Sequence, residues 1–246
     1  MDLQLKGARA IVTGGSGGIG LAVARGLLAE GARVALVARN TQRLRDAARR
    51  LGTADLLPIS TDTTDDTAVR AMVDAVVAEW GGVDVLVNAA ATPSGGAPAA
   101  LADLTDREVA ADFDTKVLGY LRCARAVAPH MVRQGAGRIV NVSGLNARRT
   151  GSMSGTIRNV AVAALTANLA DELGPHGVSA TVVHPGPVEP KPPEVRAVLA
   201  ETTSLRRLVT AEEVADVVVF LCSPRVAAVT GDGISVAGGN RGAVHY

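Results

Sequence analysis

The stretch Ala8-Arg-Ala-Ile-Val-Thr-Gly-Gly-Ser-Gly-Gly-Ile-Gly-Leu-Ala-Val-Ala-Arg-Gly-Leu-Leu-Ala-Glu30 decides the fold. It opens with a short apolar, β-branched run over 10–13, which is typical of a buried strand. A turn rich in glycine follows, and the chain then continues with the spacing of an amphipathic helix. The sequence therefore predicts a strand, a glycine turn and a helix in direct succession.

The glycine turn predicts a phosphate site. Glycine tolerates positive φ, and without a Cβ the backbone can come into contact with a bulky ligand. The first N–H groups of the following helix have no internal partner and lie at the positive end of its dipole, so they suit a pyrophosphate. The alternative is a tight connection between strand and helix that binds nothing.

Composition narrows the class of protein. The 246 residues are 48% hydrophobic but only 2% aromatic, which is typical of a parallel sheet covered on both faces. A net charge of +1 gives no electrostatic reason to expect nucleic acid or a membrane as partner. Cys123 and Cys222 are expected to be buried thiols in a reducing compartment. The spacing of the four histidines predicts no metal site, and the polar segment 1–6 is no signal peptide, so we expect a soluble cytoplasmic protein.

Strands and helices are predicted to alternate along the whole chain. Strands are expected at 10–13, 33–38, 55–60, 83–87, 138–142, 179–183 and 233–236, and helices at 41–51, 65–80, 106–134, 153–173 and 211–222. This order predicts an α/β protein, one Rossmann-like, doubly wound domain over 1–246 with ligands at the carboxyl ends of its strands. The proline-rich stretch 184–208 breaks the rhythm and is predicted to be a lid or substrate loop.

Several short motifs, in order, resemble one family. They are Thr13–Gly20 as a cofactor turn, Asp62 after the third strand, 88–91 (Asn-Ala-Ala-Ala), Pro185-Gly186 and Gly238-Gly239. Over nearly its whole length the chain resembles the short-chain dehydrogenase/reductase family. The resemblance implies a seven-stranded sheet that binds NAD(P), a substrate loop after the sixth strand, and a homotetramer or homodimer built through two long helices. The cofactor-binding residues it implies, with Arg39 added below, are Gly14, Ser16, Gly17, Gly18, Ile19, Gly20, Arg39, Asp62, Asn88, Ala89, Pro185 and Gly186.

The end of the second strand favours NADP(H) over NAD(H). A carboxylate there would bind the ribose 2′-OH of NAD and repel the 2′-phosphate of NADP. This chain has Arg39 instead, without a neighbouring acid, and a guanidinium suits a phosphate. Two observations weigh against this choice: Arg39 could simply be solvated, and Gly17 stands where NADP-preferring relatives often carry a second arginine.

The catalytic motif departs from the resemblance. The family uses a tyrosine as proton donor, a lysine four residues later, a serine on the fifth strand and an asparagine in the preceding long helix. Alignment of the helix 153–173 places Gly155 at the tyrosine position and Asn159 at the lysine position. Lys116 stands at the asparagine position, so lysine and asparagine have exchanged places. Ser143 remains at the end of the fifth strand, although an alternative alignment puts Gly144 there, because 144–155 is about two residues short.

The exchange gives three candidate proton donors. If the helices pack as in the family, Lys116 and Asn159 face each other across the pocket; the alternative is that Lys116 lies on the surface. The donor would be Lys116 itself, Ser143 through a water, or Tyr120 one helical turn after Lys116.

Further side chains around the predicted pocket have open roles. Arg148, Arg149 and Arg158 suggest an anionic substrate, or are solvated. His184 could act on the substrate, but beside Pro185 it is better explained by packing.

Three classes of function are open. The first is an NADP(H)-dependent oxidoreductase acting on a carbonyl or alcohol of a small molecule through a non-standard site. The second is non-redox chemistry on the same fold, such as dehydration, isomerisation or cyclisation. The third is a catalytically silent subunit that pairs with an active relative, or a nucleotide sensor. The fold alone does not choose among them.

Overall fold

Strand β1 (Arg9–Thr13) lies inside a parallel sheet and pairs with β2 (Arg33–Ala38) on one side and β4 (Val85–Asn88) on the other. The computed structural model describes residues 1–91 and 100–241. The other strands are β3 (Leu56–Ser60), β5 (Gly137–Val142), β6 (Val178–Pro185) and β7 (Gly233–Val236), and the seven lie in the order β3-β2-β1-β4-β5-β6-β7. The chain order reverses between β1 and β4, which is where doubly wound sheets bind their ligands.

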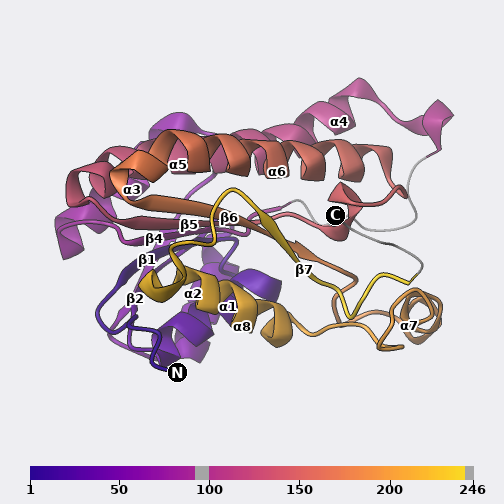
Figure 1. Cartoon of the computed structure of the whole chain (residues 1–246), viewed down its shortest axis with the longest axis horizontal. Coiled ribbons are helices and arrows are strands. Elements are labelled where there is room, and N and C mark those ends of the chain that lie inside the picture. Colours follow the sequence, from indigo (N-terminus) through magenta and orange to yellow (C-terminus); the bar gives the residue numbers. More distant parts are fainter. Residues whose placement is uncertain (92–99, 242–246) are drawn as a thin grey trace.

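Helices cover both faces of the sheet (Figure 1). One face carries α1 (Gly18–Ala29), α2 (Thr41–Leu51) and α8 (Ala211–Cys222), and the other carries α3 (Asp66–Trp80), α5 (Gly119–Gln134) and α6 (Met153–Leu173). Two short helices, α4 (Asp106–Phe113) and α7 (Pro193–Ala200), lie toward the edge of the molecule.

The core consists of two aliphatic layers, one on each side of the sheet. Neighbouring strand residues point to opposite faces, so Val12 of β1 packs under α1 and α8 whereas Ile11 packs under α3 and α5. A Rossmann-like, seven-stranded parallel sheet between helices is therefore confirmed.

Two segments differ from their predicted form. The expected helix 106–134 is divided by a π-helical turn at Asp114–Leu118, because i→i+5 bonds leave no mark on apolar periodicity. Within 184–208, β6 runs on to Pro185 and α7 forms from Pro193, because proline is compatible with the first turn of a helix. Residues 92–99, which follow the motif 88–91, lie outside the described part.

No helix of the described residues combines the length and the apolar character that a membrane crossing requires.

Candidate functional site

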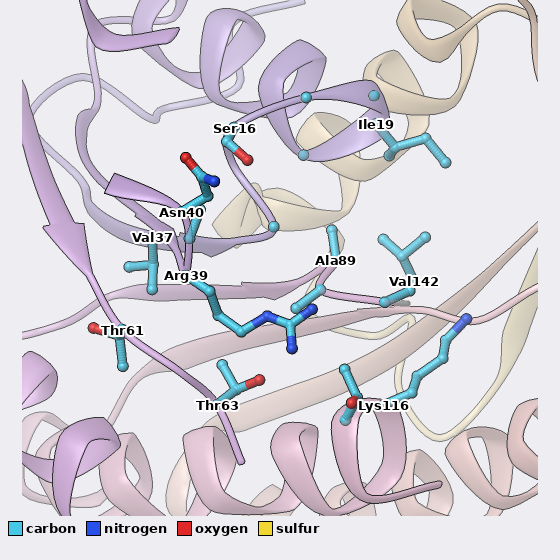
Figure 2. Close-up of a pocket in the computed structure, with 18 of the residues that line it drawn as sticks. Ser16, Ile19, Val37, Arg39, Asn40, Thr61, Thr63, Ala89, Lys116 and Val142 are labelled. Carbon is cyan, nitrogen blue, oxygen red and sulfur yellow. The ribbon is translucent and has the colours of Figure 1, made fainter. Parts of the chain in front are cut away.

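A groove of about 460 Å³ opens at the carboxyl edge of the sheet, between the glycine turn and the ends of β2, β4 and β5 (Figure 2). Its described lining contains no carboxylate, whereas three of its side chains are cationic, namely Arg39, Arg43 and Lys116. The groove therefore suits an anionic ligand. The lining residues are Gly14, Ser16–Gly20, Val37–Asn40, Arg43, Thr61, Thr63, Ala89–Ala91, Thr115, Lys116, Val142 and Ser143.

The glycines of the turn serve two purposes. Gly14 has φ +70°, and a Cβ there would lie 2.6 Å from the carbonyl oxygen of Ala89. A Cβ on Gly20 would lie 2.5 Å from the carbonyl oxygen of Gly14. Gly17 and Gly18, in contrast, would meet nothing within 4 Å. Gly14 and Gly20 thus allow close packing, while Gly17 and Gly18 leave the floor of the groove open to a ligand.

The N-terminus of α1 carries no cap from a side chain. In the described part of the chain α2, α3, α4, α6 and α8 begin at a side-chain cap, namely Asn40, Asp65, Thr105, Ser152 and Thr210. Helix α5, which continues from the π-helical turn, and the short α7 lack one, as α1 does. Helix α1 begins at Gly17, without such a cap and without an acidic residue in its first turn. The residues of its first turn line the groove. Their N–H groups have no partner within the helix and fit a diphosphate. On this observation the residues present fit a nicotinamide dinucleotide.

Two arginines stand at the β2 end of the groove. Arg39 extends into it from the end of β2 (Figure 2). Arg43 also lines it, from the first turn of α2, where its backbone N–H donates to Asn40 Oδ1 at 2.9 Å. Sequence analysis missed Arg43, although its spacing of four residues from Arg39 was visible. A second arginine, which is absent at position 17, thus lines the groove from α2.

Four residues that the resemblance assigned to the cofactor do not line the groove. Asp62 Oδ1 accepts hydrogen bonds from the backbone N–H and hydroxyl of Thr64 at 3.0 and 2.9 Å. Asn88 is fully buried, and its amide donates to Asn141 Oδ1 at 3.0 Å. Pro185 and Gly186 lie at the end of β6 beside β7. Contact of these four with a cofactor stays a prediction.

Lys116 lies at the opposite end of the groove from the β2 arginines. The π-helical turn carries it, its side chain is 4% exposed, and its Nζ donates to the carbonyl oxygen of Ser143 at 2.7 Å. Burial, assisted by the nearby Arg158, lowers the pKa of Lys116 to about 7. Lys116 is therefore a buried, readily titrated amine and not a surface residue.

Asn159 and Ser143 meet beside it. The Ser143 hydroxyl donates to the Asn159 carbonyl oxygen at 3.0 Å. A Cβ on Gly144 would lie 2.7 Å from Asn159 Nδ2, so the amide packs against the end of β5. The two exchanged residues thus approach the same short segment, Ser143–Gly144, although only Lys116 lines the groove.

The position expected for the tyrosine is closed. Gly155 is buried in the first turn of α6, where a Cβ would lie 3.1 Å from Ser152 Oγ and 3.2 Å from Asn146 Nδ2. A Cβ at this position would require these two side-chain ends to move by a few tenths of an ångström.

Tyr120 does not line the groove. It is 1% exposed, its hydroxyl donates to the Val142 carbonyl oxygen at 2.9 Å, and burial raises its pKa. This geometry describes a packing residue rather than a proton donor.

Tyr120→Phe is expected to lower stability and spare activity. The Val142 carbonyl would lose its buried donor, which costs about 1–2 kcal/mol and lowers the Tm by roughly 2–8 °C. A thermal melt and a turnover assay measure both effects. A large loss of turnover without a loss of stability would return Tyr120 to the list of donors.

Two of the three arginines suggested for an anionic substrate, Arg148 and Arg158, have protein partners. Arg158 pairs with Asp112, and Arg148 donates to the carbonyl oxygen of Gly233 at 2.8 Å. These two arginines thus contact different elements, Arg158 contacting α4 and Arg148 contacting β7. His184 is buried, and burial together with Arg148 lowers its pKa to about 4, so it is a neutral packing residue at pH 7.

Comparisons with known proteins agree with this geometry. A family model described as enoyl-(acyl carrier protein) reductase matches residues 14–241. Short-chain reductase protein NovJ of Streptomyces niveus is 36% identical over 245 residues, covering 94% of this chain and 92% of its own. A putative ketoacyl reductase of Streptomyces coelicolor is 34% identical, covering 94% and 95%.

Solved structures extend the likeness. L-sorbose reductase from Gluconobacter frateurii, complexed with NADPH and L-sorbose, superposes with a TM-score of 0.90 at 28% identity, covering 99% of this chain and 100% of that chain. From fold, groove and relatives together, the chain belongs to the short-chain dehydrogenase/reductase family.

Proposed function

We propose that this protein is an NADP(H)-dependent oxidoreductase that acts on a carbonyl or alcohol group of a small molecule, with Lys116 as proton donor in place of a tyrosine. The observation that carries the proposal is the groove itself. It joins an uncapped helix N-terminus and two arginines to a buried amine at its far end.

The groove offers a separate partner for each anionic part of the cofactor. The N–H groups at the start of α1 would hold the diphosphate. Arg39 and Arg43 would hold the 2′-phosphate, since a guanidinium forms paired, charge-assisted hydrogen bonds with phosphate oxygens. The relative solved with NADPH supports this choice.

The bound dinucleotide supplies the hydride, and the chain supplies the proton. Lys116 in its ammonium form would donate the proton from Nζ to the substrate oxygen as the carbonyl is reduced. A pKa of about 7 keeps both forms of the amine populated near neutrality. This suits an acid that must take up a new proton after each turnover. The backbone carbonyl oxygen of Ser143 accepts a hydrogen bond from Lys116 Nζ, and the backbone carbonyl oxygen of Asn159 accepts one from the Ser143 hydroxyl.

Cofactor titration and a substrate panel test the proposal. Nucleotide fluorescence should show NADPH binding at least about tenfold more tightly than NADH. Absorbance of the nicotinamide should then fall with at least one ketone or aldehyde. Absence of binding to either nucleotide would overturn the proposal. Binding without turnover on any carbonyl or alcohol would favour the silent subunit or the nucleotide sensor instead.

We also propose that the protein works in the cytoplasm as a homo-oligomer or paired with an active relative. Met153, Ile157 and Val160 are 42%, 51% and 47% exposed and follow one face of α6 at spacings of four and three residues. Such a row on a long helix suits helix packing against a second chain.

Ile157→Glu should disrupt this association. A charge placed in an apolar helix contact must be desolvated, so the variant is expected to elute as a smaller species. Light scattering after size exclusion gives the mass. Val198→Glu, at an exposed apolar residue of α7, is the matched control and should leave the mass unchanged. Equal masses for all three proteins would contradict an α6 interface.

A further inference from the structure

We propose that Asp112 and Arg158 are positioning residues for Lys116, because their ion pair ties together the two helices on either side of it and places two charges near the amine. The inference rests on the proposed function of Lys116 and adds two residues that sequence analysis did not connect to it. Neither residue lines the groove, so each would act through the lysine.

The pair joins the two helices that flank Lys116. Asp112 belongs to α4, one helical turn before Lys116, and Arg158 belongs to α6, directly before Asn159. Their side chains form an ion pair and are only 16% and 13% exposed. Ser154 Oγ donates to the other carboxylate oxygen of Asp112 at 2.6 Å. Both oxygens of Asp112 are thus engaged, which fixes the carboxylate between α4 and α6.

The pair presents two opposite charges to the buried amine. Arg158 lowers the pKa of Lys116, whereas Asp112 raises it. His184 on β6 also interacts with Lys116, but its lowered pKa leaves it neutral at pH 7. Because the pair is mostly buried, each charge is less screened than it would be in water. Burial is the largest influence on the pKa of Lys116, and Asp112 and Arg158 add two smaller, opposite contributions.

The arrangement also explains why one charge alone would not serve. Arg158 without Asp112 would be an uncompensated cation beside a second buried cation, which is strongly unfavourable. Asp112 without Arg158 would favour the ammonium form and raise the pKa of Lys116. As a pair, their opposite effects offset each other, so the lowering of the pKa by burial is largely preserved.

The test measures the titration of Lys116 directly and needs no activity. The chain contains three lysines, Lys6, Lys116 and Lys191, and the first and third are exposed. Competitive acetylation with trace anhydride across a pH series, read by mass spectrometry of the separate peptides, gives one midpoint for each lysine. Lys6 and Lys191 are internal standards in every sample.

The expected signature is a pair of opposite shifts. Asp112→Asn should lower the midpoint of Lys116 by about half a unit or more, and Arg158→Gln should raise it by a similar amount. The double variant should fall between them. Arg158→Lys keeps the charge and should leave the midpoint near that of the wild type. Asp66→Asn is the matched control, because Asp66 pairs with Arg70 and Arg125 between α3 and α5, away from Lys116.

Two outcomes would overturn the inference. One is an unchanged midpoint in both single variants. The other is a shift of both in the same direction, with Arg158→Lys shifting too, which is what a merely structural pair would give as the site loosens. The proposed function can fail separately: opposite shifts in a protein that reduces no carbonyl would keep the tuning and reject the reaction.

Discussion

Replacing Lys116 with methionine is expected to lower kcat for carbonyl reduction by about a thousandfold, since general acid catalysis contributes roughly 10²–10⁴. Methionine fills a similar volume but carries no proton. The dissociation constant of NADPH should change by less than about threefold, because the diphosphate and 2′-phosphate contacts lie elsewhere in the groove. Stopped-flow absorbance of the nicotinamide measures the chemical step.

The pH dependence supplies the second half of this prediction. A donor must be protonated, so kcat/KM for reduction should fall as the pH rises through about 7, the pKa of Lys116. In the Lys116→Met variant, kcat/KM should no longer fall with pH in this range. Lys6→Met, at an exposed lysine near the N-terminus, is the control. It should keep both the kcat and the pH dependence of the wild type. A Lys116→Met enzyme with full turnover would exclude Lys116 as the donor.

Folding stability gives an independent check on the same residue. The folded pKa of Lys116 lies below its ordinary value of 10.5, so the unfolded chain binds the extra proton between about pH 7 and 10.5. Stability contributed through this group should therefore rise with pH across that window. Lys116→Met should remove the rise and should be no less stable than the wild type at pH 6, so its loss of turnover would not reflect unfolding.

Removing both arginines at the β2 end is expected to abolish the preference for NADPH. Arg39 and Arg43 are exposed, so each charge-assisted bond is screened and we assign about a tenfold effect to each guanidinium. Arg39→Ala/Arg43→Ala should thus weaken NADPH binding by about a hundredfold. Binding of NADH, which lacks the 2′-phosphate, should change little. Fluorescence titration of the wild type and the double variant with NADPH and NADH gives four dissociation constants at each of two salt concentrations.

Arg45→Ala is the matched control for this experiment. Arg45 is exposed on the same helix but does not line the groove. Its removal should leave both nucleotides unaffected. If the double variant weakened NADH and NADPH equally, the arginines would contribute general attraction and not recognition of the 2′-phosphate.

Local sequence patterns predicted most of the framework. Helices 153–173 and 211–222 and strand 233–236 were placed with the bounds that the structure gives, because their apolar spacing and capping residues agree. The glycine turn was equally readable, since its function depends on the backbone and therefore on consecutive residues.

The Lys116 end of the groove could be predicted only in part. The resemblance aligned Gly155 and Asn159 with the family's tyrosine and lysine positions, but the burial of Lys116 depends on the π-helical turn and on packing against α6. The Asp112–Arg158 pair joins residues 46 positions apart. Nothing in local periodicity reports such a contact, because it exists only once two helices lie side by side.

The surroundings of Gly155 bear on any attempt to place a tyrosine there. A Cβ at this position would lie 3.1 Å from Ser152 Oγ and 3.2 Å from Asn146 Nδ2, so both side-chain ends would have to move by a few tenths of an ångström. Engineering a phenol at position 155 should therefore vary Ser152 and Asn146 at the same time.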